Sequence, residues 1–293
     1  MHRAGYVAIV GRPNVGKSTL LNALVGAKVA IVTPKPQTTR TRILGIRTLP
    51  EAQVVFLDTP GIHAARSRLN RRMVEVAHEA LVDADVVCLV IDAAAGVTAA
   101  DRDIAAALVS ERGPVIVILN KADRVQRPAL LPLMATLGGL VPEREIIPAS
   151  ARSGDNVATV LAAVVRALPA GPALYPDDDY TTQTERFLVE ECVREQLFLQ
   201  TEEEVPYGTA VIVDTFRAEP TRNLIVIQAT ILVDRPSHKG IVIGSGGQRL
   251  KEIGQRARLA LEPVLGAKLF LELHVRVEPG WADDPRRLRE LGL

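Results

Sequence analysis

The sequence predicts an α/β domain with a mostly parallel sheet, followed by a smaller α+β domain. Three observations lead to this prediction. Between residues 5 and 168, short β-branched runs alternate with longer Ala- and Leu-rich stretches, the rhythm of a parallel sheet covered by helices. Residues 169–183 are rich in proline and aspartate and have little apolar periodicity, as expected of a linker. From residue 184 onward the order of elements changes to α-β-β-α-α-β.

The individual elements follow from runs of β-branched residues and from amphipathic stretches. In the first domain, residues 1–168, strands are expected at 6–10, 42–49, 53–58, 86–92, 115–120 and 145–147. In the second domain, residues 184–293, helices are expected at 185–198, 240–243 and 248–265, and strands at 209–217, 224–233 and 269–277.

Composition narrows the class of protein. The 293 residues suffice for two domains, and 47% of them are apolar, enough for two buried cores. Lys and Arg number 35 against 34 Asp and Glu, and the net charge of +1 excludes a histone-like basic protein. Cys88 and Cys192 offer neither a disulfide framework nor a zinc cluster, so we expect a reducing compartment, the cytoplasm. No export signal is expected, and no apolar run reaches the roughly 18 residues of a membrane span.

Residues 11–18, GRPNVGKS, follow an expected strand and open an expected helix, which is the setting of a phosphate-binding loop. Glycine lets backbone N–H groups curl around phosphate oxygens at a helix N-terminus. Lys17 reaches the β and γ phosphates, and the Ser18 hydroxyl is placed for Mg²⁺. The loop predicts nucleotide contacts from Gly11, Arg12, Pro13, Asn14, Val15, Gly16, Lys17, Ser18 and Thr19.

Later motifs identify the nucleotide. Asp58 opens DTPG at the end of a strand, where its carboxylate can meet the magnesium shell, although a plain strand-to-loop turn has the same letters. Asp123 of NKAD can accept hydrogen bonds from the N1–H and 2-amino groups of guanine, which adenine lacks, and so favours GTP over ATP. A backbone N–H at 150–151 would meet the guanine O6. The predicted contacts are Asp58, Thr59, Pro60, Gly61, Ile62, Asn120, Lys121, Asp123, Ser150 and Ala151.

The polar stretch at 35–40 is the candidate switch loop. A switch needs a Thr whose hydroxyl binds Mg²⁺ and whose amide faces the γ phosphate, and Thr39 is preferred here over Thr38. Two threonines in a loop are also ordinary turn chemistry. Ser18, Thr39 and Asp58 are therefore the expected metal ligands. Catalysis is assigned by position and charge to Lys17, Thr39 and Gly61.

GRPNVGKST, QTTR, DTPG and NKAD, in this order, and GWADD near the C-terminus resemble the Era family of bacterial GTPases, and the resemblance covers both domains. It implies a Ras-like P-loop GTPase fold for residues 5–168 and a KH RNA-binding domain for residues 184–280. It also implies the 3′ region of the 16S rRNA as partner, assembly and maturation of the 30S small ribosomal subunit as the setting, and peripheral association with the inner face of the cell membrane. We expect a monomer that does not bind DNA.

The sequence IVIGSGGQ at 241–248 joins a short apolar helix to a basic one through a Gly-x-x-Gly turn. In KH domains such a turn lets the RNA backbone approach two helix N-termini. Ile241 and Ile243 line the groove or belong to the core. Family members often carry a basic or amide side chain where Ser245 stands, so that contact is expected to be weaker or made by Arg249. The predicted RNA contacts are Lys239, Ile241, Ile243, Gly244, Ser245, Gly246, Gly247, Arg249 and Lys251.

Two questions stay open from the sequence alone. The second domain has an alternative role as a nucleotide-gated protein- or membrane-interaction module that does not grip RNA. In related GTPases the Asn of G-x-P-N-x-G-K-S helps to hold K⁺, a role that the resemblance extends to Asn14; the alternative is that Asn14 only stabilises its own loop. Finally, Ile62 stands where Ras-type enzymes place a water-orienting Gln, so we expect slow hydrolysis in isolation.

Overall fold

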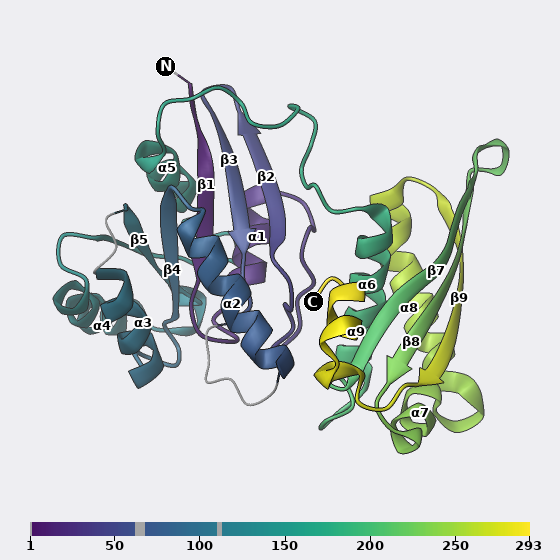
Figure 1. Cartoon of the computed structure of the whole chain (residues 1–293). Coiled ribbons are helices and arrows are strands. Elements are labelled where there is room, and N and C mark those ends of the chain that lie inside the picture. Colours follow the sequence, from purple (N-terminus) through teal and green to yellow (C-terminus); the bar gives the residue numbers. More distant parts are fainter. Residues whose placement is uncertain (1, 62–67, 110–112) are drawn as a thin grey trace. The chain divides into compact units, whose positions relative to one another are not determined.

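The computed structural model describes residues 2–61, 68–109 and 113–293. The chain forms two compact units, each with its own sheet (Figure 1). The first unit comprises residues 1–30, 39–66 and 70–182, and the second comprises 31–38, 67–69 and 183–293. Residues 31–38, which hold most of the candidate switch loop, thus group with the second unit. None of the helices that the structure describes is long and apolar enough to cross a membrane.

The first unit is built on a six-stranded sheet in the order β2-β3-β1-β4-β5-β6. Strand β2 pairs antiparallel with β3, and the other neighbouring strands are parallel, which confirms the predicted mostly parallel sheet. Every residue of β3, β4 and β5 is buried, as expected of strands covered on both faces. The strands are β1 (Arg3–Val10), β2 (Ile43–Leu49), β3 (Ala52–Asp58), β4 (Val86–Asp92), β5 (Val115–Asn120) and β6 (Glu145–Pro148).

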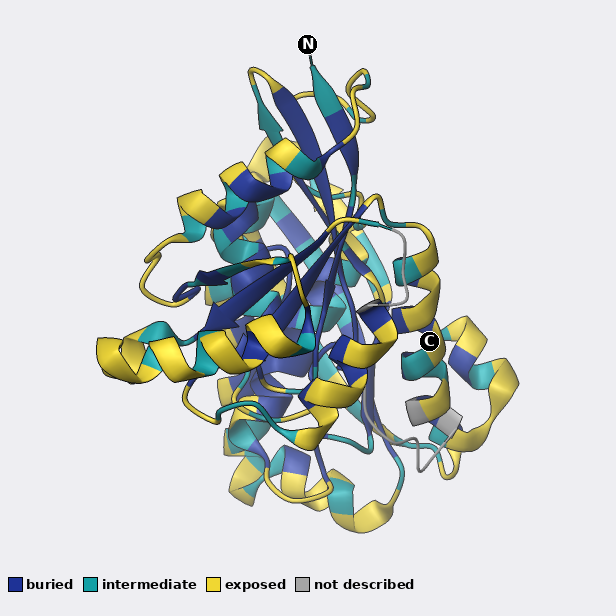
Figure 2. Cartoon of the chain, turned by 90° about the vertical axis from the view of Figure 1, so that its left-hand side faces the viewer, coloured by how far each residue is buried: buried dark blue, intermediate teal, exposed yellow. Residues whose placement is uncertain are grey.

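Helices surround this sheet, and their apolar sides face it (Figure 2). Ile104 and Leu108 of α3 and Leu137 of α4 pack in one core with alternate residues of β1, β4 and β5. The helices are α1 (Lys17–Val25), α2 (Arg68–Val82), α3 (Ala99–Val109), α4 (Arg127–Leu140) and α5 (Val157–Ala167), with a 3₁₀ turn at η1 (Ala122–Arg124). The carboxyl ends of β1, β3, β4 and β5 lie at one edge of the sheet, where ligands bind in folds of this class.

The linker expected at 169–183 lies along the first sheet up to residue 182. The Ala4 N–H donates to the Pro169 carbonyl at 3.2 Å, and the Ile46 N–H donates to the Tyr180 carbonyl at 2.9 Å. The Gln53 side chain accepts from the N–H groups of Leu174 and Tyr175. These bonds order a segment that composition alone marks as irregular. The domain boundaries that we expect from the sequence stay a prediction.

The second unit has the α-β-β-α-α-β order that the sequence predicts. Its sheet runs β7-β8-β9, with β7 and β8 antiparallel and β8 and β9 parallel. Helices α6 and α8 pack on one face of the sheet through Val193, Leu197, Ile253 and Leu261. The elements are α6 (Glu185–Gln200), β7 (Thr209–Glu219), η2 (Pro220–Arg222), β8 (Leu224–Val233), α7 (Pro236–Ile243), η3 (Ser245–Gly247), α8 (Gln248–Leu265), β9 (Lys268–Val277), η4 (Trp281–Asp283) and α9 (Pro285–Glu290).

Candidate nucleotide and RNA sites

The segment between β1 and α1 has the backbone of a phosphate-binding loop. Gly11 and Gly16 have φ values of 149° and 97°. A Cβ at Gly11 would lie 2.4 Å from the Val90 carbonyl oxygen, and one at Gly16 would lie 2.4 Å from Asn120 Nδ2. Both positions therefore need glycine for conformation and for space. Asn14, at φ 64°, adopts the left-handed conformation that Asn tolerates better than most residues.

Lys17 is buried inside this loop. Its Nζ donates to the Gly11 carbonyl at 3.0 Å and to the Arg12 carbonyl at 3.1 Å. Burial is the main reason that the pKa of Lys17 falls to about 8; Asp58 opposes this change, and the charge of Arg12 adds to it. An anion placed between these groups would favour the charged ammonium.

Ser18, Thr39 and Asp58, the expected metal ligands, meet in one cluster. The Ser18 hydroxyl donates to Asp58 Oδ2 at 2.5 Å, and the Thr39 hydroxyl lies 2.9 Å from Ser18 Oγ and 3.4 Å from Asp58 Oδ2. Asp58 Oδ1 is buried and has no hydrogen-bond partner within residues 2–61, 68–109 and 113–293. Burial raises the pKa of Asp58 to about 6, against the opposing effects of Lys17, the two hydroxyls and the Thr59 N–H. The cluster thus places a buried carboxylate beside two hydroxyls.

The two threonines of the switch loop have different partners. The Thr38 hydroxyl lies 2.6 Å from Thr33 Oγ1 and donates to the Lys35 carbonyl at 2.9 Å, which is ordinary turn chemistry. The Thr39 hydroxyl instead faces Ser18 and Asp58. This difference supports the choice of Thr39 as the candidate metal ligand.

Gly61 contacts the phosphate loop directly. A Cβ at Gly61 would lie 2.7 Å from both the Cα and the N of Pro13. The DTPG segment and the loop are therefore in backbone contact. Ile62, the next residue and a predicted nucleotide contact, lies outside the described residues.

Asn120 joins the loops around the predicted base pocket. Its Nδ2 donates to the Val15 carbonyl at 2.8 Å, and its Oδ1 accepts from the Ala151 N–H at 3.0 Å. The Ser150 N–H donates to the Asp155 carbonyl. Both amides expected near the guanine O6 thus have partners within the protein, and their contact with guanine stays a prediction. Asp123 is exposed on η1.

Lys121 links the NKAD loop at 120–123, called the base loop below, to the phosphate-binding loop. It adopts a left-handed conformation, and its Nζ donates to the Asn14 carbonyl at 2.6 Å and to Asp92 Oδ2 at 2.7 Å. Asp92, at the end of β4, also accepts from the Ala94 N–H. Asp92 is not among the site residues predicted from the sequence, although it has the same signal as Asp58 and Asn120: a polar residue that ends a buried apolar strand.

The Gly-x-x-Gly turn of the second unit lies between α7 and α8. Gly244, Gly246 and Gly247 all have positive φ, of 72°, 56° and 78°. A Cβ at Gly244 would lie 2.8 Å from Arg249 Cβ, whereas one at Gly247 would meet nothing within 4 Å. Gly247 is therefore required by its backbone conformation alone. Ser245 lies between these glycines in η3.

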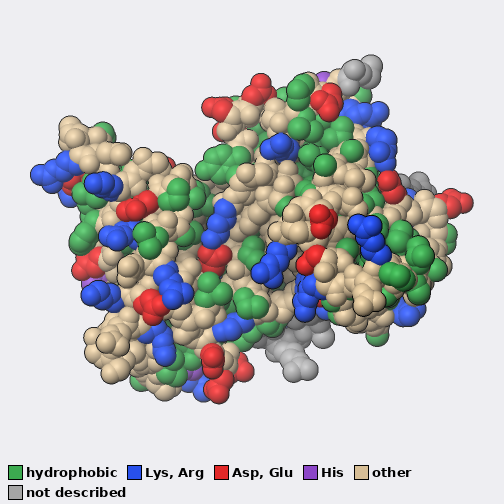
Figure 3. Space-filling view, turned by 180° about the vertical axis from the view of Figure 1, so that it is seen from behind, with side chains coloured by type: hydrophobic (Ala, Val, Ile, Leu, Met, Phe, Trp, Pro, Cys, Tyr) green, Lys and Arg blue, Asp and Glu red, His purple; other side chains and the backbone are tan. Residues whose placement is uncertain are grey.

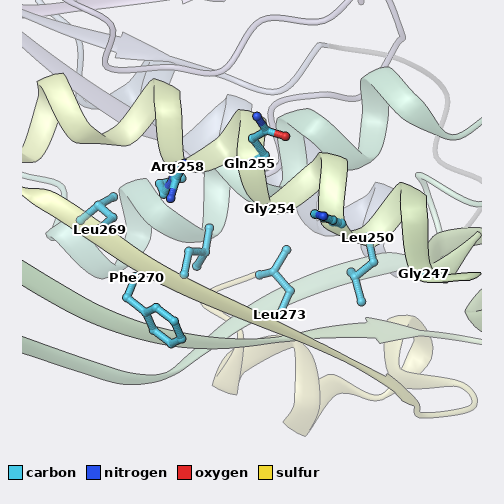
Figure 4. A pocket seen from close by; sticks show the side chains of 10 residues that line it. Gly247, Leu250, Gly254, Gln255, Arg258, Leu269, Phe270 and Leu273 are labelled. Carbon is cyan, nitrogen blue, oxygen red and sulfur yellow. The ribbon is translucent and has the colours of Figure 1, made fainter.

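A groove of about 700 Å³ runs between α8 and β9 beside this turn (Figure 4). Gly247 and Lys251 line it, as do Leu250, Gly254, Gln255, Arg258, Leu269, Phe270, Leu271 and Leu273. Phe270 is 56% exposed. Among the predicted contacts, Ile241 is 41% exposed and does not line this groove, and Val242 rather than Ile241 or Ile243 enters the core. The apolar side chains that line it are Leu269, Phe270, Leu271 and Leu273 of β9 and Leu250 of α8. The sequence predicts the β9 strand but assigns it no site.

Only some of the basic side chains near the groove lie beside acidic neighbours. Arg256 pairs with Glu252, and Arg258 lies 4.0 Å from Glu262. Lys239 and Lys251 form no ion pair with the residues that the structure describes. Arg249 donates to the Ile241 carbonyl. In the view of Figure 3, Lys and Arg side chains lie among acidic and apolar ones rather than in one large patch. The basic side chains that can attract phosphate groups are therefore those near the Gly-x-x-Gly turn.

Family models match both units. One, described as a 50S ribosome-binding GTPase, matches residues 6–121, and a KH domain model matches residues 204–282. The fold and these segments define a Ras-like GTPase that carries a KH domain. GTPase Era of Syntrophus aciditrophicus is 49% identical over 293 residues, which cover 100% of this chain and 95% of that protein. The chain belongs to the Era family of GTPases, which hydrolyse GTP.

Further relatives agree with this assignment. GTPase Era of Geobacter metallireducens is 48% identical over 99% of this chain and 97% of its own length. A solved structure of a variant Era of Aquifex aeolicus bound to GDP.AlF4- has a TM-score of 0.96 and 44% identity, covering 99% of each chain. Era in complex with MgGDPNP and nucleotides 1506–1542 of 16S ribosomal RNA has the same TM-score and identity, covering 100% of this chain and 99% of that one. The predicted family, fold and GTPase activity are confirmed.

Proposed function

We propose that this chain is a GTP-driven switch whose KH domain binds single-stranded RNA at the 3′ region of 16S rRNA, during assembly and maturation of the small ribosomal subunit. The observation that carries the proposal is the groove between α8 and β9, with its apolar wall, its exposed Phe270 and a left-handed glycine turn at one end. Bases can lie on such a wall while the turn admits the RNA backbone. The complex of Era with nucleotides 1506–1542 supports this choice of RNA.

The guanine nucleotide is proposed to occupy the carboxyl edge of the first sheet. The loop at 11–19 would surround the phosphates, and the exposed carboxylate of Asp123 would accept the two donors of guanine. Asn120 and Lys121 would act mainly by joining the base loop to Val15 and Asn14. The bound GDP.AlF4- and MgGDPNP of the related structures support a guanine nucleotide here.

Magnesium fits the cluster of Ser18, Thr39 and Asp58. The buried Asp58 Oδ1 has no hydrogen-bond partner in the described part of the chain, and two hydroxyl oxygens lie beside the same carboxylate. Hard oxygen ligands completed by phosphate oxygens and water are typical of Mg²⁺ in nucleotide sites. Among the described residues no group of three His, Cys, Asp or Glu side chains offers an alternative site. The ion would neutralise phosphate charge, while Lys17 and the N–H of Gly61 would orient the terminal phosphate.

Potassium is a further proposed cofactor, with Asn14 as its protein ligand. Asn14 has a left-handed backbone conformation, and its carbonyl accepts a hydrogen bond from Lys121. These two features hold the backbone from which the Asn14 side chain extends. We expect faster GTP hydrolysis in K⁺ than in Na⁺ at equal ionic strength, with saturating Mg²⁺. The difference should vanish in Asn14→Ala. Equal rates of the unmodified protein in the two salts would leave Asn14 a structural role only.

The RNA proposal is tested by fluorescence anisotropy with a labelled RNA that carries the 16S 3′ sequence. A scrambled RNA of equal length and anionic vesicles serve as comparison probes across a salt series. We expect the cognate RNA to bind preferentially at moderate salt and Gly244→Asp/Gly247→Asp to abolish this binding while GTP binding persists. Affinity that follows charge alone on all three probes would favour the membrane- or protein-interaction role instead.

The cellular location is proposed from the cysteines. Cys88 and Cys192 are both buried and are not joined by a disulfide, which agrees with a reducing compartment such as the cytoplasm. We also propose peripheral association with the inner face of the membrane. Binding of the anionic vesicles at physiological salt would support it.

A further inference from the structure

We infer that Asp101, on helix α3, is a positioning residue for GTP hydrolysis, because it holds the phosphate loop through the guanidinium of Arg12. The inference rests on the proposed nucleotide site. Asp101 lies far along the sequence from the loop and belongs to none of the nucleotide motifs.

The two side chains form an ion pair at the edge of the loop. Arg12 Nε lies 3.2 Å from Asp101 Oδ2. The Asp101 side chain is fully buried and that of Arg12 is 19% exposed, so water screens this pair far less than it screens the surface pairs of the protein. A buried carboxylate is costly unless it has a partner, and Arg12 is its only cationic partner among the described residues.

Asp101 also belongs to the start of α3, which fixes its position. Its Oδ2 accepts from the Thr98 N–H at 2.9 Å and from the Thr98 hydroxyl at 2.7 Å, and the Asp101 N–H donates back to Thr98 Oγ1 at 3.4 Å. This is a reciprocal helix cap. The carboxylate that holds Arg12 is therefore attached to a rigid helix, which packs on the sheet through Ile104 and Leu108.

Arg12 in turn connects to the reacting end of the loop. Its carbonyl accepts from Lys17 Nζ at 3.1 Å, and its charge contributes to the lowered pKa of Lys17. The next residue, Pro13, is in backbone contact with Gly61. Moving Arg12 would thus displace both the lysine that meets the phosphates and the surface on which the switch glycine lies.

The ion pair has a donor and an acceptor that could form a second hydrogen bond. Arg12 Nη2 and Asp101 Oδ1 are both buried, and neither has a hydrogen-bond partner among the residues that the structure describes. A guanidinium and a carboxylate can form two parallel bonds when they face each other as forks. We expect the pair to form both hydrogen bonds when the phosphates order the loop. The second bond would then stabilise the arrangement of the loop that is competent for hydrolysis.

The experiment compares Asp101→Asn, Arg12→Gln, the double variant and Thr98→Val in the full chain. In Asp101→Asn the amide oxygen can still accept the cap bonds but the charge is lost, whereas Thr98→Val weakens the cap and leaves the ion pair in place. Readouts are kcat and KM for GTP, GDP affinity, and the melting temperature. We expect each single ion-pair variant to lower kcat roughly tenfold, the usual order for a lost charge-assisted hydrogen bond, with GDP affinity changing much less.

The double variant should be no slower than the slower single variant, because both substitutions remove one interaction. Thr98→Val keeps the bond from the Thr98 N–H to Asp101 and the ion pair, so it should lower the melting temperature but lower kcat much less than Asp101→Asn does. Additive losses, a parental kcat in folded Asp101→Asn, or an equal loss of kcat in Thr98→Val would overturn the inference. Lys17→Ala distinguishes a failure of the proposed nucleotide site from a failure of the inference about Asp101. If Lys17→Ala still binds GDP normally, the proposed nucleotide site is wrong, and the inference that rests on it is wrong as well.

Discussion

Gly61→Ala tests the contact between the switch segment and the phosphate loop. The added Cβ would lie 2.7 Å from the Cα and N of Pro13, well inside the 3.4 Å at which ordinary contact begins. Both atoms belong to the backbone, so no side-chain rotation relieves the overlap. Overpacking of this kind costs about 1–3 kcal/mol. If the GTP-bound state needs the contact, affinity for a GTP analogue should fall by a factor of roughly 5–150.

The measurement is a pair of titrations with fluorescent GDP and with a fluorescent non-hydrolysable GTP analogue, followed by the hydrolysis rate. We expect the GTP analogue to lose more affinity than GDP, together with slower hydrolysis. Gly139→Ala is the matched control: a Cβ there meets nothing within 4 Å, and the residue lies in α4 without a positive φ, so the change should be neutral or slightly stabilising. Unchanged affinity for the GTP analogue in Gly61→Ala would refute the reasoning.

Three further predictions concern other parts of the molecule. Asp123→Asn should cost about 2–4 kcal/mol of GTP binding and shift preference toward xanthosine triphosphate, as measured by competition; equal GTP affinity would contradict the proposed base pocket. Phe270→Ala should weaken RNA binding, by about 1–3 kcal/mol if one base stacks on the ring, while the free energy of unfolding changes by less than about 1 kcal/mol. Glu190 has a pKa raised chiefly by burial, so the folded state retains its proton longer and stability falls as pH rises through the window above 4.5. Glu190→Gln, which can still accept from Val213 N–H, should remove this pH dependence in urea unfolding curves; an unchanged dependence would exclude Glu190 as its source.

The fold and the nucleotide motifs are the part that the sequence predicts well. Fully apolar runs such as those of β4 and β5 indicate strands covered on both faces, and GRPNVGKS contains its own helix start. Such signals are local, so a single sequence suffices. Helix α7 shows the limit even of local signals: it begins at Pro236 rather than near residue 240, because proline is well suited to a first helical turn.

The supporting contacts of the site were not predictable in the same way. Asp92 meets Lys121 and Asp101 meets Arg12 across large separations in sequence, and neither aspartate has a motif of its own. The sequence likewise gives no sign that residues 31–38 group with the second unit. In the KH domain, helical spacing alone could not decide which of three consecutive apolar residues faces inward, and the structure selects Val242.

The groups proposed to act on GTP already have partners within the protein. Lys17 uses two loop carbonyls, and Ser18 and Thr39 share Asp58. Binding of the nucleotide is therefore an exchange of hydrogen bonds, and each neutral exchange contributes only about 0.5–1.5 kcal/mol net. What the folded chain supplies is orientation, because buried groups held by helices and strands need little rearrangement when charge develops on the phosphate. The residues that fix this orientation, among them Asn120, Asp92 and Asp101, should thus influence the rate of hydrolysis more than the affinity for GDP.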